Sequence, residues 1–435
     1  MLPAAGVEGP TYGRHIAFAL VIGADSDTYV RMGPREGTGM RVLQIGKYYP
    51  PHRGGMEAHL EVLCGELKTQ VDLDVLVCND ERRQRTETID GVRVTRCFEI
   101  ARVASASICP TMPLEIARRR YDVIHFHFPH PVGAMSYLVG PRRHPHAVIV
   151  SYHADIVRQR RLLEAYRPFM RMLLRRADAI VCATPSYRES SVELEDYKHK
   201  VEVIPFGIDF AKGAPTAAVM RVAAEIRARH GGRPIVLGVG RLVPYKGFEH
   251  LVRAMRQVDA TLLLVGAGPL RESLESLAQE VSVRERVQFL GEMDDIALRA
   301  CYEACDVFVL PSIDRSEAFA LVQLEAMAAG KPVVNTSIPG SGVAWVSRDD
   351  ESGLTVPPRD PEALAAAMNR LLADASLRAR LGSEGRARVE REFTKRVMAD
   401  RVIKLYRSFA PTAKDGTDGH RAGSRRERFA ADRNA

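Results

Sequence analysis

Residues 235–247 read IVLGVGRLVPYKG and join a short apolar run to a turn that carries two cations. The run Ile235–Val239 has the length and the β-branched content of a buried strand. Arg241 and Lys246 follow it in the turn. In most proteins such a pair of cations is simply charge on the solvated surface. In open parallel sheets, however, ligands bind beyond the carboxyl ends of the strands, so this stretch also predicts a phosphate-binding loop in an α/β fold.

Similar apolar runs recur on both sides of this stretch, with amphipathic segments between them. They lie at residues 42–45, 71–77, 123–126, 147–150 and 179–183, and again at 261–265, 287–289, 307–310 and 332–334. Strands that alternate with helices predict parallel sheets covered on both faces. Two series of about five strands predict an α/β chain with two doubly wound, Rossmann-like domains that face each other.

Changes in composition mark the domain limits. Residues 1–39 are an expected extension with little order, and Met40 opens the first clean strand pattern, so Met40 is a candidate for the true start. We expect a first domain over residues 40–210, a second over 211–390, and a helix at about 391–408 that returns to the first domain. The boundary falls near residues 208–232, where Gly, Pro and Lys cluster. Residues 411–435 lack apolar positions and are expected to be disordered.

The composition is that of a globular protein in a reducing compartment. Of 435 residues, 46% are hydrophobic and 27% are charged. The apolar segment at residues 15–23 is short and lacks a basic region before it, so neither a signal peptide nor a membrane anchor is expected. Seven scattered cysteines without a CxxC pair favour the cytoplasm. The net charge of +8 favours anionic partners.

An acidic motif lies in the stretch EAFALVQLEAMAAGKPVV at residues 317–334, where eight positions separate Glu317 from Glu325. We expect a helix over residues 319–329 whose first free N–H groups hold phosphate oxygens. Along a helix this spacing separates the carboxylates by about 12 Å. The acid pair of a glycoside hydrolase lies roughly 5–9.5 Å apart. The spacing therefore favours contacts with two ends of one ligand over hydrolysis.

Taken together, these motifs resemble the retaining glycosyltransferases of family 4, which have the GT-B fold. GRLVPYKG (240–247), VGAGP (265–269), FLGEM (289–293) and the E-x7-E segment occur in the order of that family. MRVLQIGKYYPPHRGGMEAHLEVLCGEL (40–67) is similar to its first strand, glycine loop and first helix, and SYHADIVRQ (151–159) to its strand followed by a histidine. The resemblance covers about residues 40–408 and is strongest to bacterial mannosyl- and rhamnosyl-type members. PGSGVAWVS (339–347) departs from the family pattern at Ser341 and Ala344, which leaves the donor sugar open.

The resemblance implies a site. Its catalytic residues are His153, Glu317, Arg241 and Lys246. Its donor-binding residues are Gly54, Gly55, Arg241, Lys246, Gly266, Gly268, Met293, Glu317, Phe319, Ala320, Leu321 and Glu325. The cations and amides hold the diphosphate, Glu317 the sugar and Glu325 the ribose, while Gly266, Gly268 and Met293 line the base pocket and His153 lies near the reacting sugar carbon. No metal or other cofactor is expected, because the two cations take the place of the metal.

The same resemblance implies the substrates. We expect a nucleotide-sugar donor, and GDP-mannose is the leading candidate. Its hexose is expected to pass to a lipid-linked or oligosaccharide acceptor in cell-surface polysaccharide synthesis. There are two alternatives. One is an enzyme that transfers a sugar from a UDP-sugar to a small soluble acceptor, and the other is a nucleotide-binding protein without activity. A nucleic-acid partner is disfavoured, because no helix-turn-helix, zinc-finger or aromatic RNA-binding pattern occurs.

Two further features each allow two interpretations. The segment from Arg158 to Arg176 is basic and carries an apolar stripe at helical spacing. It is either a core helix with a solvated face or a surface that attracts anionic lipid, which would make the protein peripheral on the inner face of the membrane. His125, His127 and His130 favour a cleft wall or packing over a metal site, because no third ligand in register is evident.

Overall fold

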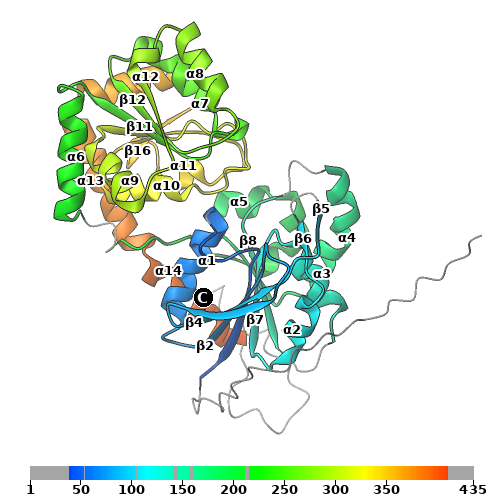
Figure 1. Ribbon diagram of the computed structural model, residues 1–435. Coiled ribbons are helices and arrows are strands. Elements are labelled where there is room, and N and C mark those ends of the chain that lie inside the picture. Colours follow the sequence, from blue (N-terminus) through cyan, green and yellow to red (C-terminus); the bar gives the residue numbers. More distant parts are fainter. Residues whose placement is uncertain are drawn as a thin grey trace, which may run out of the picture. The chain divides into compact units, whose positions relative to one another are not determined.

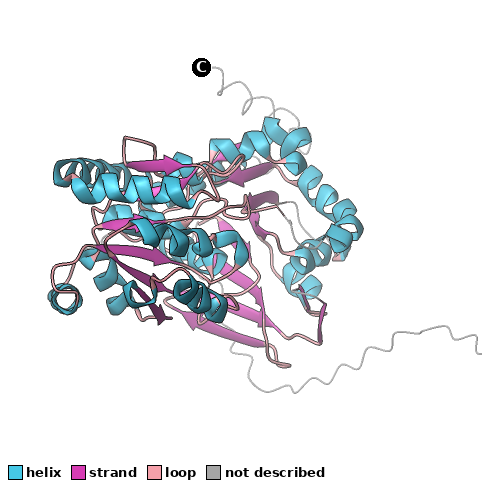
Figure 2. Ribbon diagram, turned by 90° about the horizontal axis from the view of Figure 1, so that it is seen from above, coloured by secondary structure: helices cyan, strands magenta, loops and turns pink. Residues whose placement is uncertain are grey.

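The computed structural model describes residues 39–409 except 53, 104–105, 142–145, 156–159 and 211–214. Within these residues the chain forms two α/β lobes, each with a central sheet (Figure 1). Figure 2 shows the strands of the sheets running between layers of helices. Apart from Gly39, the expected extension over residues 1–39 and the expected tail over 411–435 lie outside the described residues.

An eight-stranded sheet forms the first lobe. Its strands are β1 (Arg41–Ile45), β2 (Asp72–Cys78), β3 (Arg85–Ile89), β4 (Val92–Cys97), β7 (Val123–Phe128), β8 (Ala147–Tyr152), β9 (Ala179–Cys182) and β10 (Val201–Val203). Their order is β10-β9-β8-β7-β1-β2-β4-β3, and all neighbours are parallel except β3 and β4. β5 (Ala101–Val103) and β6 (Ala106–Ile108) form a separate antiparallel pair. The order reverses beside β1, so β1 and β7 flank the point at which ligands of such sheets bind.

Helices cover both faces of this sheet and bury two apolar clusters. They are α1 (Gly55–Leu67), α2 (Met112–Arg118), α3 (Pro131–Val139), α4 (Arg160–Arg176) and α5 (Pro185–Ser190), followed by the 3₁₀ segment η1 (Val192–Lys200). The final helix, α14 (Lys395–Phe409), packs against α1 and buries Met398, Val402 and Tyr406 in the core of the first lobe. The expected returning helix is therefore confirmed.

The second lobe is built on a six-stranded parallel sheet. Its strands are β11 (Ile235–Val239), β12 (Thr261–Val265), β13 (Val287–Gly291), β14 (Val307–Val309), β15 (Val333–Thr336) and β16 (Gly353–Val356). Their order is β13-β12-β11-β14-β15-β16, the order of a dinucleotide-binding fold. The direction of winding changes between β11 and β14. The loops that follow these two strands therefore meet at the switch point.

The helices of the second lobe also lie on both faces of its sheet and enclose two apolar clusters. They are α6 (Ala217–Arg229), α7 (Phe248–Ala254), α8 (Arg271–Glu280), α9 (Asp295–Ala304), α10 (Leu321–Ala328), α11 (Val343–Val346), α12 (Pro361–Ala373) and α13 (Ala375–Glu392). Three short 3₁₀ segments complete the lobe: η2 (Pro244–Lys246), η3 (Met255–Gln257) and η4 (Arg284–Arg286). The two doubly wound domains expected from the sequence are thus confirmed.

Three details differ from the sequence expectations. The sheets also contain β3, β4, β10 and β16, which lie outside the apolar runs identified in the sequence. α6 occupies residues 217–229 of the expected boundary, because Val219 and Ala223 bury against the second lobe. α10 begins at Leu321 instead of residue 319, because Ala320 has φ 63°, which a right-handed helix does not accommodate.

The chain crosses between the lobes twice, and the two crossing segments run side by side. Ile208 donates its N–H to the carbonyl of Phe393 at 2.9 Å and accepts from the N–H of Lys395 at 2.8 Å. The Lys395 ammonium also lies 2.9 Å from the carboxylate of Asp209. No helix in the described ranges is long and apolar enough to cross a membrane.

Candidate functional site

The turn after β11 and the loop after β14 bring two of the predicted catalytic residues into contact. Lys246 Nζ lies 2.5 Å from Glu317 Oε2, and each residue is only 7% exposed. Ser312 Oγ donates to the same carboxylate oxygen at 3.1 Å, and Ser341 Oγ donates to the backbone carbonyl of Glu317. A buried cation and a buried carboxylate are thus held together at the switch point of the second sheet.

Arg241 lies in the same turn but differs in its surroundings. Its side chain is exposed, and no residue in the described part of the chain forms a hydrogen bond or ion pair with its guanidinium. A guanidinium presents several N–H donors in a planar fork that matches phosphate oxygens. The turn therefore offers one cation already paired and one cation available to an anion.

Backbone packing explains the two glycines of the VGAGP turn. A Cβ at Gly266 would lie 2.1 Å from the carbonyl oxygen of Gly240, and φ is 129°. A Cβ at Gly268 would lie 2.4 Å from the carbonyl oxygen of Leu242. Both positions need glycine so that this turn can rest against the backbone of the GRLVPYKG turn. Their contribution to a base pocket stays a prediction.

Three predicted amide donors precede or open α10. Phe319 and Ala320 are buried, and Leu321 is half-buried. Among the described residues, no hydrogen bond uses the backbone N–H groups of these three positions. Their free N–H groups and the positive end of the α10 dipole form a site that suits an anion, although only Leu321 belongs to the helix.

The second acidic residue of the motif faces a pocket. The hydroxyl of Tyr302 donates to Glu325 Oε2 at 2.7 Å, and burial raises the pKa of the Glu325 carboxyl. Glu325, Leu321 and Tyr302 line a pocket of about 200 Å³ that His59 and Gly207 line from other elements. Met293 does not line this pocket, and its sulfur lies 3.7 Å from that of Cys301.

The glycine loop of the first lobe lies where the sequence predicts a helix to start. Gly54 is the N-cap of α1 and Gly55 its first residue, and both are exposed. The acidic side chain of Glu57 occupies the first turn of the helix. Its carboxylate reaches back over Gly54. The N-terminus of α1 therefore faces an internal negative charge, and the contact of Gly54 and Gly55 with the donor stays a prediction.

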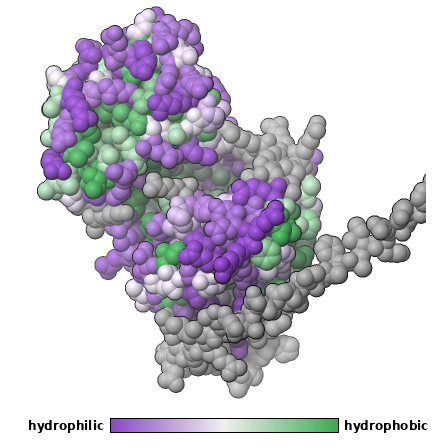
Figure 3. Space-filling view, viewed as in Figure 1, coloured by the Kyte–Doolittle hydropathy of each residue, from purple (hydrophilic) through white to green (hydrophobic). Residues whose placement is uncertain are grey.

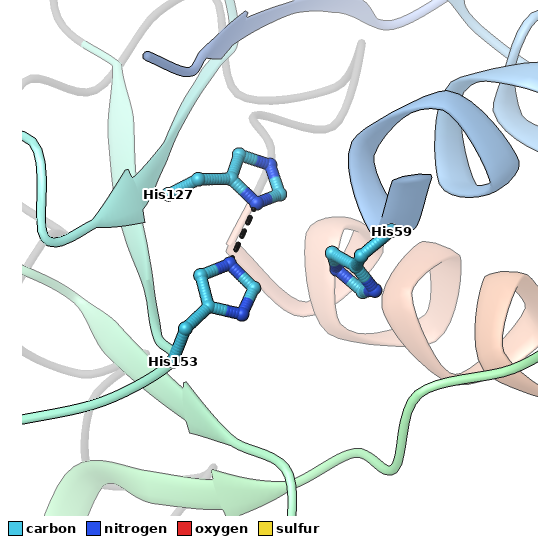
Figure 4. Close-up of side chains that lie close together, drawn as sticks. All are labelled: His59, His127 and His153. Atoms are coloured by element: carbon cyan, nitrogen blue, oxygen red, sulfur yellow. Dashed lines mark hydrogen bonds between the residues drawn. The ribbon is translucent and has the colours of Figure 1, made fainter. Parts of the chain in front are cut away.

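His153 lies in a buried cluster of histidines. His127 Nδ1 and His153 Nε2 are 3.0 Å apart, and Figure 4 shows the two rings pointing toward each other while His59 approaches from α1. His125 and His127 share one face of β7, as the alternation predicts, with ring centroids 4.7 Å apart. His125 and His127 are fully buried instead of lining an open cleft, and His130 is also buried.

Burial makes these histidines hard to protonate. It lowers the pKa of His125, His130 and His153 to about 3, and it lowers the pKa of His59 and His127 well below the usual value. The imidazoles are therefore neutral near pH 7. A neutral imidazole carries one donor and one acceptor, so the hydrogen bonds decide which nitrogen holds the proton.

Comparison with known proteins identifies the family. Residues 222–388 match the family described as Glycosyl transferases group 1, and residues 53–212 match Glycosyltransferase Family 4. The chain is 32% identical over 374 residues to the O-antigen chain mannosyltransferase C of Escherichia coli, across 84% of this chain and 98% of that protein. The chain belongs to glycosyltransferase family 4. It is also 34% identical to the D-rhamnosyltransferase WbpZ of Pseudomonas aeruginosa, across 82% of this chain and 92% of that protein.

A further relative and a solved structure agree with this assignment. The glycosyltransferase is 28% identical to the GDP-mannose-dependent alpha-(1-6)-phosphatidylinositol monomannoside mannosyltransferase of Mycolicibacterium smegmatis, across 79% of this chain and 92% of that protein. It superposes on the sucrose-phosphate synthase from Thermosynechococcus elongatus with a TM-score of 0.70 at 26% identity, covering 85% and 98% of the two chains. The expected GT-B fold is confirmed.

In this glycosyltransferase the histidine cluster also has the composition of a metal site. The ligand atoms of His59, His127 and His153 lie within 4.8 Å of one another, and neutral imidazoles are common ligands of zinc. His59 is the third ligand that the sequence expectation lacked. The motif GGMEAHL holds the signal, because α1 follows β1 and so starts beside β7 at the switch point of the first sheet. A hydrogen bond between His127 and His153 occupies the position that a metal would take.

The basic helix of the glycosyltransferase packs as its apolar stripe predicts. Tyr166, Met170, Leu173 and Leu174 of α4 are buried in the first lobe. On the opposite face Arg171, Met172 and Arg175 are exposed, whereas Arg167 and Arg176 form ion pairs with Glu193 and Asp178. Arg158 and the side chains of Arg160 and Arg161 lie outside the described residues.

Proposed function

We propose that this glycosyltransferase moves a hexose from a nucleotide sugar onto a lipid-linked oligosaccharide in the synthesis of a cell-surface polysaccharide. GDP-mannose is the leading candidate for the donor. The sugar carbon keeps its configuration. One observation carries the proposal: the buried Lys246–Glu317 pair lies at the switch point of the second sheet, in a turn that also carries the exposed Arg241, whose guanidinium has no partner among the described residues. The Escherichia coli relative is a mannosyltransferase and the Mycolicibacterium smegmatis relative is GDP-mannose-dependent, which supports mannose and a GDP-linked donor.

Fixed positive charge supplies the chemistry. Breaking the bond between the sugar carbon and the diphosphate leaves negative charge on the leaving group, which Arg241, Lys246 and the free N–H groups before α10 stabilise. The acceptor oxygen forms its bond to the sugar carbon on the face from which the diphosphate departs. The acceptor proton passes to the departing phosphate oxygen. No other base is needed, and the configuration at the sugar carbon is kept.

Glu317 and Glu325 bind the two ends of the donor in this proposal. Glu317 is fixed by Lys246, Ser312 and Ser341 and accepts hydrogen bonds from sugar hydroxyls. Glu325 projects into the pocket of about 200 Å³ and accepts from the ribose hydroxyls. The Tyr302 hydroxyl donates to the Glu325 carboxylate and holds it in place. Leu298 and Leu321 provide apolar walls for this pocket.

The donor is tested with a panel of nucleotide sugars in the presence of EDTA. We expect the protein to bind GDP-mannose more tightly than UDP-glucose and ADP-glucose by calorimetry. Transfer to a lipid-linked acceptor should give a product whose anomeric configuration, read by NMR, equals that of the donor. Inversion, or activity that returns only when a divalent cation is added, would contradict the mechanism. Preference for a UDP-sugar would replace the donor assignment and leave the mechanism intact.

The exposed face of α4 supports a contact with anionic lipid. Arg171 and Arg175 flank Met172, which is 51% exposed, so two cations surround an apolar side chain on the solvent face. This arrangement suits the interface of an anionic bilayer, where a lipid-linked acceptor lies. Figure 3 shows apolar residues also gathered on the second lobe around α6 and α9, where Met220 and Ile296 are exposed. Among the described residues of α6 and α9, Arg227, Arg229 and Arg299 form ion pairs, so the proposal concerns α4 alone.

Sedimentation with vesicles tests this contact. We expect the protein to sediment with phosphatidylglycerol vesicles at low salt and to dissociate as salt rises, because each arginine near an anionic surface contributes about 1 kcal/mol. The double variant R171E/R175E should lose this binding. The matched variant R253E/R256E makes the same charge change on exposed positions of the second lobe and should keep it. Equal loss in both variants would show a net-charge effect instead of a docking face.

A further inference from the structure

A chain of buried hydrogen bonds joins the returning helix α14 to His153. Gln44 Nε2 donates to the hydroxyl of Tyr406 at 2.8 Å. Gln44 Oε1 lies 2.9 Å from His127 Nε2, and His127 Nδ1 lies 3.0 Å from His153 Nε2. Gln44 and Tyr406 are each 0% exposed, so water does not interrupt the chain at that end.

A side branch continues from the Tyr406 hydroxyl to His125 and Ser151. His125 Nδ1 lies 2.5 Å from this oxygen, and His125 Nε2 lies 2.8 Å from Ser151 Oγ. The hydroxyl accepts from Gln44 and therefore has its own proton left to give to His125. His125 then carries its proton on Nε2 and donates to Ser151.

Only two proton arrangements satisfy every link of this chain. In the arrangement that the structure contains, the Gln44 carbonyl accepts the Nε2 proton of His127. His127 Nδ1 then accepts from His153 Nε2, which leaves His153 Nδ1 without a proton. If the Gln44 amide were reversed, each proton would shift by one link and His153 Nδ1 would carry one. Because an unpaired buried polar group costs about 1–3 kcal/mol, mixed arrangements are disfavoured.

We infer that Tyr406 and Gln44 are positioning residues that set the tautomer of His153 through His127, so that His153 Nδ1 is a hydrogen-bond acceptor for a hydroxyl of the bound sugar. Within the described residues this nitrogen has no hydrogen-bond partner. The inference rests on the proposed function for the identity of the ligand. The tautomer itself depends only on the hydrogen-bond chain.

The hydrogen bonds that begin at Tyr406 give the returning helix α14 a second role. Tyr406 lies 362 positions after Gln44 in the sequence and reaches β1 because α14 packs on the first lobe. Docking of α14 therefore fixes more than apolar contacts. It supplies the hydroxyl that orients the Gln44 amide, and through it the imidazole of His153.

Nitrogen NMR reads the tautomer in the unaltered protein. With ¹⁵N-labelled histidine, and with H153Q to assign the signal, we expect His153 Nδ1 to show the shift of an unprotonated nitrogen and Nε2 that of a protonated one. A protonated Nδ1 overturns the inference. This measurement needs no substrate, so it stands apart from the proposed function. If the tautomer is as inferred but no nucleotide sugar reacts, the proposed function is wrong, whereas the inferred role of Tyr406 and Gln44 stands.

The variant Y406F tests the role of the hydroxyl. Without it the Gln44 amide loses the partner that selects its orientation, so the His153 nitrogens should shift toward averaged values. We expect kcat to fall about fivefold or more, as for loss of one net hydrogen bond, with the donor KM within about twofold. Y121F is the matched control, because it removes a buried phenol that donates to Asp74 in the same lobe outside the chain. It should change neither the shifts nor kcat by more than about twofold.

Two results would overturn the inference. One is a Y406F protein whose His153 shifts and kcat equal those of the unaltered protein. The other is one Zn²⁺ per chain that survives dialysis and is lost in H59A, because a metal would take the His127 nitrogen on which the chain depends. If Y406F does not fold, the tautomer of His153 in the unaltered protein still tests the inference.

Discussion

Replacing Lys246 by alanine is expected to lower kcat by about 10²-fold or more, because it removes a preorganised charge from the position proposed for the leaving diphosphate. E317A should have an effect of the same size. Both side chains are buried and lie 2.5 Å apart, so neither is replaced readily by water. Steady-state kinetics with the best donor measures the effect. Turnover near that of the unaltered enzyme in either variant would refute these roles.

Stability must be separated from catalysis in this experiment. Removing one partner of a buried ion pair leaves the other charge unpaired, at a cost of about 3–5 kcal/mol in the free energy of unfolding. The double variant K246M/E317Q removes both charges and should recover much of that stability while staying inactive. K200A is a control, because Lys200 donates to backbone carbonyls of the first lobe outside the site. It should keep kcat within about twofold, since its ammonium touches no reacting group.

The free energy of unfolding is expected to fall steeply as the solution becomes acidic. His59, His125, His127, His130 and His153 have lowered pKa values in the folded protein because they are buried. Below the unfolded pKa of about 6.5 the unfolded chain binds more protons than the folded one. Stability is therefore full above about pH 6.5 and is lost as the pH falls toward the folded values near 3.

The slope is large because the histidines act together. Each contributes about 1.4 kcal/mol per pH unit within this window. Urea unfolding at pH 7, 6 and 5 measures the slope. H130Q should reduce it by about one proton, because His130 is buried but lies outside the hydrogen-bond chain to Tyr406. Stability that hardly changes between pH 7 and 5 would show that the cluster is hydrated or already charged.

Much of the second lobe was predictable from local patterns. Ile235–Val239 and Thr261–Val265 are strands with the expected ends, because continuous apolar runs are buried on both faces of a parallel sheet. The meeting of Lys246 with Glu317 follows from strand order: β11 and β14 are neighbours, so the loops after them adjoin. A motif resemblance could name these residues, and the topology explains why they touch.

The histidine cluster, and the hydrogen bonds that link it to α14, were not predictable in the same way. His59 lies on α1, and the motif GGMEAHL points to it only once the strand order is known, because its neighbours His127 and His153 come from two other elements. Tyr406 carries the signature of an ordinary core residue at helical spacing. Its contact with Gln44 depends on where a carboxyl-terminal helix docks, which no local pattern encodes. The left-handed conformation of Ala320, after which α10 begins, likewise has no signal in the local pattern.

Calorimetric titration of nucleoside diphosphate in EDTA is the most direct test that a cationic turn holds the leaving group. The unaltered protein should bind whichever of GDP, UDP or ADP matches its donor without added metal. R241A and K246A should each weaken that binding by about tenfold or more, as loss of a charged hydrogen bond predicts. Unchanged affinity in both variants, or binding that appears only with a divalent cation, would contradict the account.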